Sequence, residues 1–213
     1  MALDALSAGQ FEWAFYWVSL GIFFDFFDGF FARTLGVSGP LGVQLDSLAD
    51  MVNCGLVPGY AVFVYLSHTV GWPVYAAALG FAITLGSAYR LARFNLDTRQ
   101  SHGFIGLPTP ANALLFTSWL AAWQRGHEVH MAWMMQPAVL VGAALLSVWL
   151  MNAELPLFSL KIKKPWVWRQ YAFPLAFMTL AVVALAIFNL WAMPFIIVGY
   201  VASSALMPRP QAV

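Results

Sequence analysis

Four of the nine acidic residues of this chain lie close together in the sequence, at Asp25, Asp28, Asp46 and Asp50. The first two are three positions apart and the last two are four apart, so in helices each pair falls on one face, one turn apart. Two neighbouring helices with such pairs at the same depth would form one acidic pocket. Its carboxylates would repel one another and lose hydration, at a cost on the order of several kcal/mol each, unless cations or protons neutralised them.

Divalent cations are the neutralising partners that we expect. Hard oxygen ligands in this number suit Mg²⁺ or Mn²⁺, and two such ions roughly 3.5–4 Å apart are the usual clamp for displacement at phosphorus. A helix cap or a solvated helix end explains a single aspartate well. It does not explain two matched pairs set among phenylalanines, as in the stretch FFDFFDGFFAR at 23–33. The sequence therefore predicts a site for two divalent cations.

The residues that follow the first aspartate pair suit a bulky phosphorylated ligand. Gly29 and Ala32 leave room for a ligand to approach the backbone, and Arg33 offers a fork for phosphate. The segment 34–41 must turn the chain back, and Gly42 then opens the second helix. The alternative interpretation is that the glycines serve helix packing and the arginine anchors a helix end at the membrane surface.

The composition is that of a membrane protein, since 62% of the 213 residues are hydrophobic, 9% are charged and the mean hydropathy is +0.75. We expect an all-α, polytopic membrane helix bundle of about seven transmembrane helices. We place them at roughly 11–33, 43–67, 72–94, 108–124, 133–151, 170–187 and 190–207, the last two as a helical hairpin.

We expect one integral membrane domain over 1–213, with catalytic core helices in 11–124 and additional helices in 125–213. The lone Cys54 excludes an internal disulfide. No Lys or Arg precedes the first apolar stretch, which argues against a cleaved secretory signal. The net charge of +1 gives no indication of a nucleic-acid partner, and we expect none.

The distribution of positive charge predicts the orientation, because Lys and Arg near span ends stay on the cytoplasmic side. If the first helix runs inward, Arg125 is the only one of the ten Lys and Arg residues left outside. We therefore expect a multi-pass protein of the cell (inner) membrane whose aspartates face the cytoplasm. The nine residues on the aspartate side are Arg33, Arg90, Arg93, Arg99, Lys161, Lys163, Lys164, Arg169 and Arg209.

Residues 25–50, DFFDGFFARTLGVSGPLGVQLDSLAD, match DxxDGxxARx8GxxxDxxxD at every fixed position. This is the signature of the CDP-alcohol phosphotransferases, which the chain therefore resembles. RLARFN at 90–95, GLPTP at 106–110 and SLADMVNCGLVPG at 47–59 are similar to the phosphatidylserine synthase branch, the CDP-diacylglycerol-serine O-phosphatidyltransferases. The resemblance covers about residues 11–115 well.

The resemblance implies the CDP-alcohol phosphotransferase fold and transfer of a phosphatidyl group from CDP-diacylglycerol to L-serine, giving phosphatidylserine and CMP in phospholipid biosynthesis. By resemblance, the four aspartates hold two Mg²⁺ or Mn²⁺ ions. Asp50 is also the catalytic base, and members are typically homodimers. The residues implied in binding the CDP moiety are Asp25, Gly29, Ala32, Arg33 and Gly42. Members usually begin with a further helix, commonly announced by P-N-x-L-T. Since about ten residues precede the first span, we expect a truncated start or a member without that helix.

Serine carries a carboxylate and an ammonium, so its site needs charged partners. Arg90 and Arg93 lie three apart at the inner end of the third helix, with Asn95 nearby, and are candidates for serine binding. Both arginines are equally well interpreted as interfacial anchors. Two other functions remain open: a related phosphotransferase that uses glycerol 3-phosphate or inositol phosphate, and a membrane transporter with intramembrane carboxylates.

Overall fold

The computed structural model describes the chain except for residues 37–38, 97–103, 127–131, 155, 158–167 and 207–213. Within the helices and strands, the side chains at 32–33, 104–105, 156–157, 168–175, 191 and 205–206 also lie outside the description. Five of the residues predicted on the cytoplasmic side, Arg99, Lys161, Lys163, Lys164 and Arg209, fall in the first group. The side chains of Arg33 and Arg169 fall in the second.

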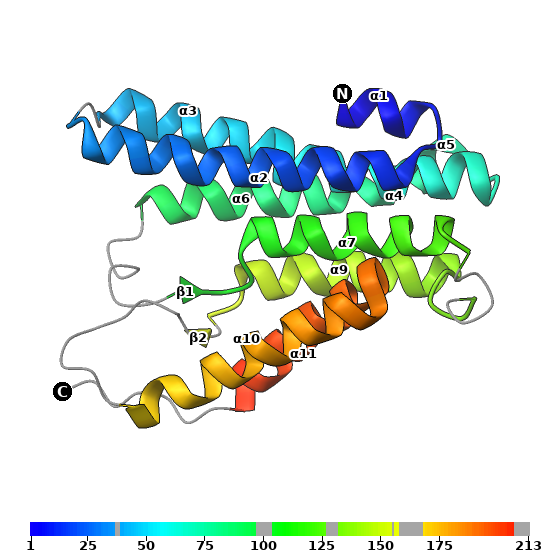
Figure 1. The fold of residues 1–213 in the computed structure, drawn as a ribbon. Coiled ribbons are helices and arrows are strands. Elements are labelled where there is room, and N and C mark those ends of the chain that lie inside the picture. The colour runs from blue at the N-terminus through cyan, green and yellow to red at the C-terminus, as the bar shows by residue number, and fades with distance from the viewer. Residues whose placement is uncertain (37–38, 97–103, 127–131, 155, 158–167, 207–213) are drawn as a thin grey trace.

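The described chain is a helical bundle, which confirms the predicted fold class (Figure 1). The helices up to residue 96 are α1 (Ala2–Ser7), α2 (Phe11–Thr34), α3 (Pro40–Asp50), η1 (Met51–Leu56), α4 (Val57–Val64), η2 (Tyr65–Thr69), α5 (Val74–Ala77), η3 (Ala78–Phe81) and α6 (Ala82–Leu96). The later ones are α7 (Thr109–Gln124), α9 (Pro137–Asn152), α10 (Trp168–Phe188), η5 (Asn189–Trp191) and α11 (Ala192–Leu206). One short antiparallel pair, β1 (Phe104–Ile105) with β2 (Pro156–Leu157), accompanies them.

Among the described residues, three helical stretches are long and apolar enough to cross a membrane, at Phe11–Phe31, Pro40–Thr69 and Val74–Leu96. The second runs without a break from α3 through η2 and contains two π-helical segments, η1 and η2. Three shorter apolar helices cover Pro137–Asn152, Ala176–Phe188 and Ala192–Ser204. That these shorter helices also span the membrane stays a prediction.

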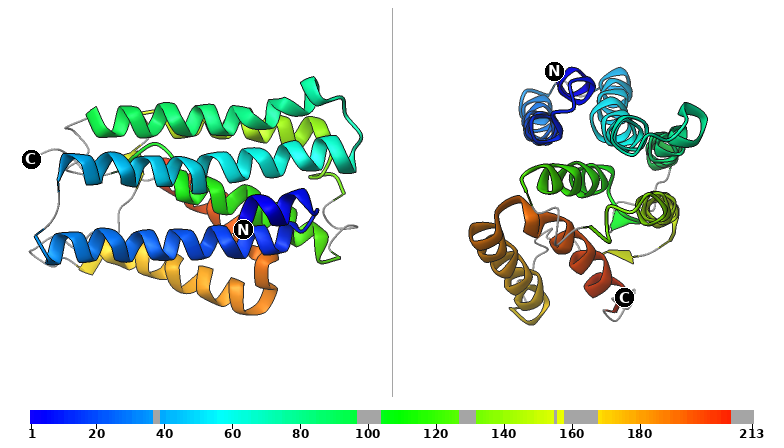
Figure 2. Two further views of the ribbon diagram at one scale, coloured as in Figure 1. Left: turned by 90° about the horizontal axis from the view of Figure 1, so that it is seen from above. Right: turned by 90° about the vertical axis from the view of Figure 1, so that its right-hand side faces the viewer.

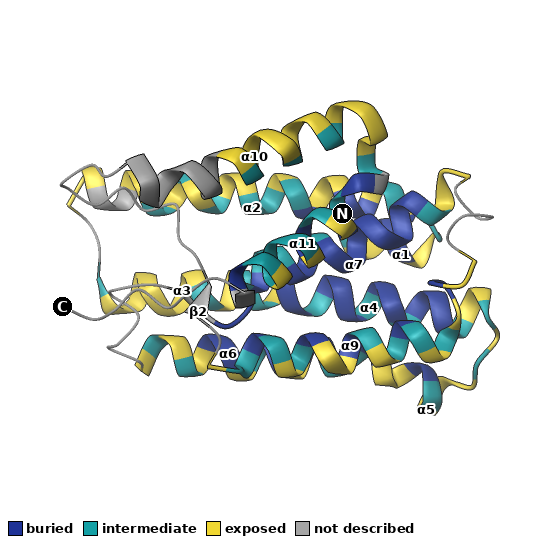
Figure 3. Cartoon of the chain, turned by 90° about the horizontal axis from the view of Figure 1, so that it is seen from below, coloured by how far each residue is buried: buried dark blue, intermediate teal, exposed yellow. Residues whose placement is uncertain are grey.

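Helix α7 forms the centre of the bundle, because eleven of its 16 residues are buried. Phe116 and Leu120 are fully buried, and α7 packs against α2 on one side and α11 on the other. The end-on view in Figure 2 shows α7 between the layer that contains α2 to α4 and the hairpin of α10 and α11. In contrast, phenylalanines of the aspartate stretch such as Phe23, Phe26 and Phe30 are at least half exposed, as expected for side chains that face lipid (Figure 3).

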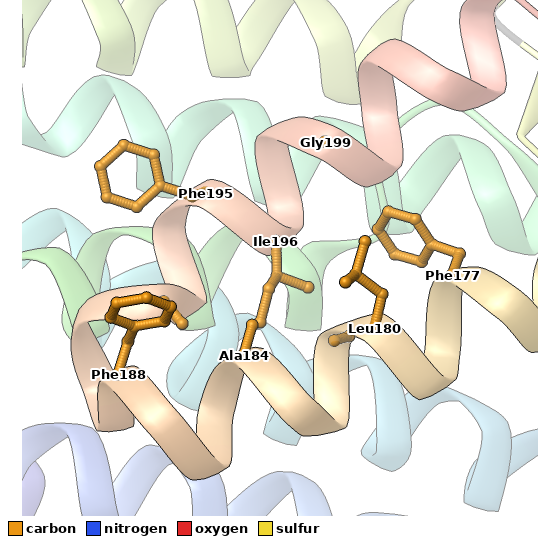
Figure 4. A pocket seen from close by; sticks show the side chains of 9 residues that line it. Phe177, Leu180, Ala184, Phe188, Phe195, Ile196 and Gly199 are labelled. Atoms are coloured by element: carbon orange, nitrogen blue, oxygen red, sulfur yellow. The ribbon is translucent and has the colours of Figure 1, made fainter.

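The predicted helical hairpin at the C-terminal end is present, with η5 as its turn. Asn189 starts this turn with φ of 53°, a left-handed conformation that asparagine tolerates better than most residues. Between α10 and α11 lies a cavity of about 430 Å³, with an almost entirely apolar lining. Phe177 and Leu180 of α10 and Ile196 of α11 line it, and it includes none of the aspartates (Figure 4).

At the opposite end of the bundle from the aspartates, α2 and α7 are joined. Arg125, which follows α7, forms an ion pair with Glu12 and donates a hydrogen bond to Tyr16 Oη at 2.8 Å. Gln124 accepts a hydrogen bond from the Glu12 backbone and donates one to the Gly9 carbonyl. The hydrogen bond to Glu12 raises the pKa of Arg125. These contacts fix the start of α2 against the central helix.

Candidate active site

The two aspartate pairs lie on antiparallel neighbours. Helices α2 and α3 run in opposite directions, with the turn between them at one end of the bundle. Helix α3 lies between α2 and α6 (Figure 2). The Asp25 side chain is within hydrogen-bond reach of Asp46, and Asp28, Asp46 and Asp50 all act on it electrostatically. Asp25 and Asp50 are half-buried, whereas Asp28 and Asp46 are exposed. The structure thus brings carboxyl groups of both helices together at one depth.

The donor chemistry of this cluster fits divalent cations, because four carboxyl groups from two helices offer hard oxygen ligands. Like charges so close together require a proton or a cation between them. The ligand geometry is not fully assembled, however. Within the part of the chain that the structure describes, no three His, Cys, Asp or Glu side chains are grouped tightly enough to hold a metal ion. The assignment of two cations to these aspartates therefore stays a prediction.

Arg90 of α6 lies beside the aspartates with unused hydrogen-bond donors. Its side chain is 7% exposed and it interacts electrostatically with Asp50. Nε and Nη2 are buried and have no partner among the described residues. These two nitrogens form one edge of the guanidinium, the arrangement that binds a carboxylate or a phosphate through two hydrogen bonds. The Phe94 ring lies 5.9 Å from the guanidinium carbon. Such a buried edge can receive an anion.

Arg93 and Asn95 have partners within the protein. Arg93 donates to the Asn152 carbonyl at 3.1 Å and pairs with Glu154 at 2.9 Å, which joins α6 to the end of α9. Asn95 Nδ2 donates to Ser47 Oγ at 2.9 Å and so connects α6 to α3, one residue after Asp46. Of the three serine-binding candidates, Arg90 is the one whose buried donors remain available.

The predicted nucleotide-binding residues lie along the same helices. Gly29 is half-buried in α2. Gly42 of α3 is exposed, and a Cβ there would meet no atom within 4 Å, so its surroundings are open. Ala32 and Arg33 belong to α2, but their side chains lie outside the described part. Their roles stay predictions.

Sequence reasoning missed two residues next to Asp50, both in η1. Asn53 Nδ2 donates to the Val18 carbonyl of α2 at 3.2 Å, and Cys54 Sγ donates to Asp50 Oδ1 at 3.7 Å. A π-helical turn leaves no clear periodic signal, so these contacts were not visible in the sequence. The glycine at position 21 is a signal in the sequence for the Asn53 contact, because a Cβ there would lie 2.5 Å from Asn53 Nδ2.

Curated proteins from several organisms are similar in sequence to this chain. Three of them are each named CDP-diacylglycerol--serine O-phosphatidyltransferase. The Helicobacter pylori protein is 36% identical over 117 residues, which cover 54% of this chain and 48% of the relative. The Bacillus subtilis protein is 32% identical over 110 residues, with 52% and 61% covered. The Methanocaldococcus jannaschii protein is 38% identical over 98 residues, with 46% and 45% covered. The chain therefore spans about half the length of the curated relatives it matches.

A family model described as CDP-alcohol phosphatidyltransferase matches residues 1–149. The match includes both aspartate pairs, Arg90 and the central helix α7. It extends over well more than half of the chain and agrees with the signature spacing at 25–50. The chain belongs to the CDP-alcohol phosphatidyltransferase family.

Proposed function

We propose that this protein transfers the phosphatidyl group of CDP-diacylglycerol to L-serine, giving phosphatidylserine and CMP. The observation that carries the proposal is the meeting of Asp25 with Asp46 and Asp50, next to the unpartnered guanidinium edge of Arg90. A cluster of candidate metal ligands beside a candidate anion site supports the proposal. The names of the relatives from bacteria and an archaeon support the choice of serine as the acceptor.

The aspartates have the role of cation ligands in this proposal. Asp25, Asp28 and Asp46 would hold two Mg²⁺ or Mn²⁺ ions, with Asp50 contributing. When bound, the cations supply positive charge that stabilises the pyrophosphate oxygens as CMP departs. Gly29, Ala32, Arg33 and Gly42 would surround the cytidine diphosphate moiety of the lipid substrate; the exposed, open position of Gly42 supports this.

Asp50 would serve as the general base. In the reaction, the serine hydroxyl oxygen forms a bond to the phosphorus of the phosphatidyl group, and the bond from that phosphorus to the CMP oxygen breaks. The hydroxyl proton moves to a carboxylate oxygen of Asp50. A hydrogen bond from Cys54 holds that carboxylate, and the positive charge of Arg90 also acts on it. A base that a hydrogen bond orients can be aimed at a bound hydroxyl.

Arg90 would bind the carboxylate of serine. Nε and Nη2 would each donate one hydrogen bond to it, which would satisfy both buried donors. Serine would then lie between Arg90 and Asp50, with its hydroxyl near the base. Arg93 is the weaker candidate, because Asn152 and Glu154 already occupy its guanidinium. An acceptor without any anionic group, such as water, would leave the buried Arg90 edge unpaired, which disfavours it. Between serine and a phosphorylated acceptor, the names of the relatives support serine.

We further propose that the aspartate end of the bundle faces the cytoplasm in the cell (inner) membrane. Arg90 and Arg93 lie at this end, and Arg125 lies at the opposite end (Figure 1). The distribution follows the preference of Lys and Arg for the cytoplasmic side. Membrane lipids would then deliver CDP-diacylglycerol laterally, while serine and CMP would exchange with the cytoplasm.

The proposal is tested by an acceptor panel with purified protein in detergent. CMP release from CDP-diacylglycerol is measured with L-serine, glycerol 3-phosphate, inositol phosphate or water, each with Mn²⁺ and with excess chelator. We expect release with L-serine and Mn²⁺ only, and the lipid product should contain the label of radioactive serine. The Asp46→Asn variant is the inactive control. Release with glycerol 3-phosphate alone would replace serine by another acceptor, and absence of release with every acceptor would overturn the enzymatic proposal.

A further inference from the structure

One side chain crosses between the two helices that carry the aspartates. Asn53 lies in η1 and its Nδ2 donates a hydrogen bond of 3.2 Å to the Val18 carbonyl of α2. The crossing is possible because position 21 is glycine: a Cβ there would lie 2.5 Å from Nδ2 and 2.8 Å from Cγ of Asn53. Contacts this short do not occur in proteins, so a larger residue at position 21 would push the amide away from α2.

The position of this contact matches the register of the aspartates. Asp25 is seven residues after Val18, and Asp46 is seven residues before Asn53. In two antiparallel helices, residues that are equally many positions away from a shared contact lie at the same depth. Seven residues at 1.5 Å per residue correspond to roughly 10 Å from the contact. Asp25 and Asp46 are within hydrogen-bond reach of each other, as this count requires. The amide contact is therefore in register with the approach of Asp25 to Asp46.

The same turn also holds the fourth carboxylate. The π-helical segment η1 begins directly after Asp50, and π-turns commonly lie at functional sites. In this turn Cys54 is fully buried and donates to Asp50 Oδ1 at 3.7 Å, while Asn53 Nδ2 also reaches Cys54 Sγ at 3.9 Å. A continuous set of contacts thus leads from the α2 backbone through Asn53 and Cys54 to Asp50.

We propose that Asn53 is a positioning residue that sets the register of the two aspartate pairs, and that Gly21 is the position that admits its side chain. The inference rests on the proposed function, because the carboxyl groups that Asn53 would position are the proposed cation ligands. Asn53 touches neither substrate nor cation; it acts through the α2 backbone and through Cys54.

Three variants remove the contact in different ways. Asn53→Ala removes the amide, Asn53→Leu keeps the branched shape of the side chain without a donor, and Gly21→Ala fills the space that the amide needs. Two matched controls make the same chemical changes elsewhere. Asn152→Ala deletes an amide that donates to the Gly86 carbonyl between α9 and α6, and Gly142→Ala adds a methyl group where nothing lies within 4 Å.

The first readout is Mn²⁺ binding to the purified protein without substrates. It is measured from the electron paramagnetic resonance signal of the Mn²⁺ that stays free. We expect the three variants to weaken Mn²⁺ binding roughly 10- to 100-fold, as loss of outer partners of metal ligands does, and the two controls to bind like the wild type. In the serine assay the variants should lower kcat and leave the KM for serine nearly unchanged. Gly21→Ala combined with Asn53→Ala should be no worse than the poorer single variant, because both remove one contact.

The outcomes separate this inference from the proposed function. Wild-type affinity for Mn²⁺ in Asn53→Leu and Gly21→Ala, in protein that elutes as a folded species, would overturn the register role, and so would a wild type that binds no Mn²⁺. Equal losses in Asn152→Ala would show a general effect of loosened helices and would overturn it too. If the wild type binds Mn²⁺ and releases no CMP with any acceptor, the proposed function fails, while the comparison of Mn²⁺ affinities still tests Asn53.

Discussion

Replacement of Arg90 by lysine tests how the acceptor is recognised. Arg90 is buried, interacts electrostatically with Asp50, and presents Nε and Nη2 without partners among the described side chains and backbone. Lysine keeps the positive charge but lacks the planar edge that binds both oxygens of a carboxylate. We therefore expect Arg90→Lys to lose one of two charge-assisted hydrogen bonds to serine and to keep the attraction to Asp50.

The size of the effect follows from that one bond. A hydrogen bond to a charged group contributes about 1.5–3 kcal/mol, and each 1.36 kcal/mol corresponds to a factor of ten. The KM for serine should therefore rise roughly 10- to 150-fold. The KM for CDP-diacylglycerol should change much less, because the nucleotide is assigned to residues of α2 and α3. If the bond forms only in the transition state, the same factor appears in kcat instead.

The assay varies serine at saturating CDP-diacylglycerol and then varies the lipid at saturating serine, in detergent micelles with Mn²⁺. Arg93→Lys is the matched comparison, since it makes the same change one turn further on. Asn152 and Glu154 already bind Arg93, so we expect a lower melting temperature and a smaller rise in the serine KM. Equal increases in both Michaelis constants for Arg90→Lys, or a larger serine effect in Arg93→Lys, would refute the assignment of Arg90.

Three further predictions address the base, the packing and the far end of the bundle. Asp50→Asn should lower kcat by about 10²- to 10⁴-fold with a measurable Mn²⁺ affinity retained, and near-normal turnover would require another base. Gly80→Ala should destabilise the protein by about 1–3 kcal/mol in thermal denaturation, because its Cβ would lie 2.8 Å from the Gly59 carbonyl oxygen; an unchanged melting temperature would contradict this close packing. In a double-mutant cycle, the ion pair of Arg125 with Glu12 should contribute about 0.2–1 kcal/mol of stability with serine turnover unaffected, and a loss of turnover would argue against its distance from the site.

The long helices could be predicted from sequence because each is an apolar segment with a clear break after it, whereas the six-residue helix α1 (Ala2–Ser7) was not expected. That α7, at the predicted span 108–124, crosses a membrane stays a prediction, because it is not among the apolar helices named above. The predicted span at 11–33 corresponds to Phe11–Thr34 of α2, and the tight turn near Asn189 joins α10 to α11 as expected. The two-residue strands were not expected, since such a short pair leaves no alternating pattern. The π-helical turns were missed for a similar reason: they add one residue to a helix without changing its composition.

The spacing of the four aspartates predicted the candidate site better than the overall hydrophobic pattern did. Helical periodicity alone placed Asp25 and Asp28 on one face and Asp46 and Asp50 on another, and the structure brings Asp25 to Asp46. The serine candidates could not be separated from sequence, because Arg90 and Arg93 differ in their partners and not in their type or spacing. Burial of unpaired donors distinguishes Arg90, and burial depends on tertiary packing.

We propose that two divalent cations lie between α2 and α3, held by the four aspartates. Anomalous diffraction from crystals soaked in Mn²⁺, with data collected at the manganese absorption edge, would locate these cations. We expect two anomalous peaks, roughly 3.5–4 Å apart, each within bonding distance of carboxyl oxygens from both helices. Carboxyl groups of Asp25 and Asp46 that point apart, with no shared anomalous peak between them in a well-ordered soaked crystal, would contradict it.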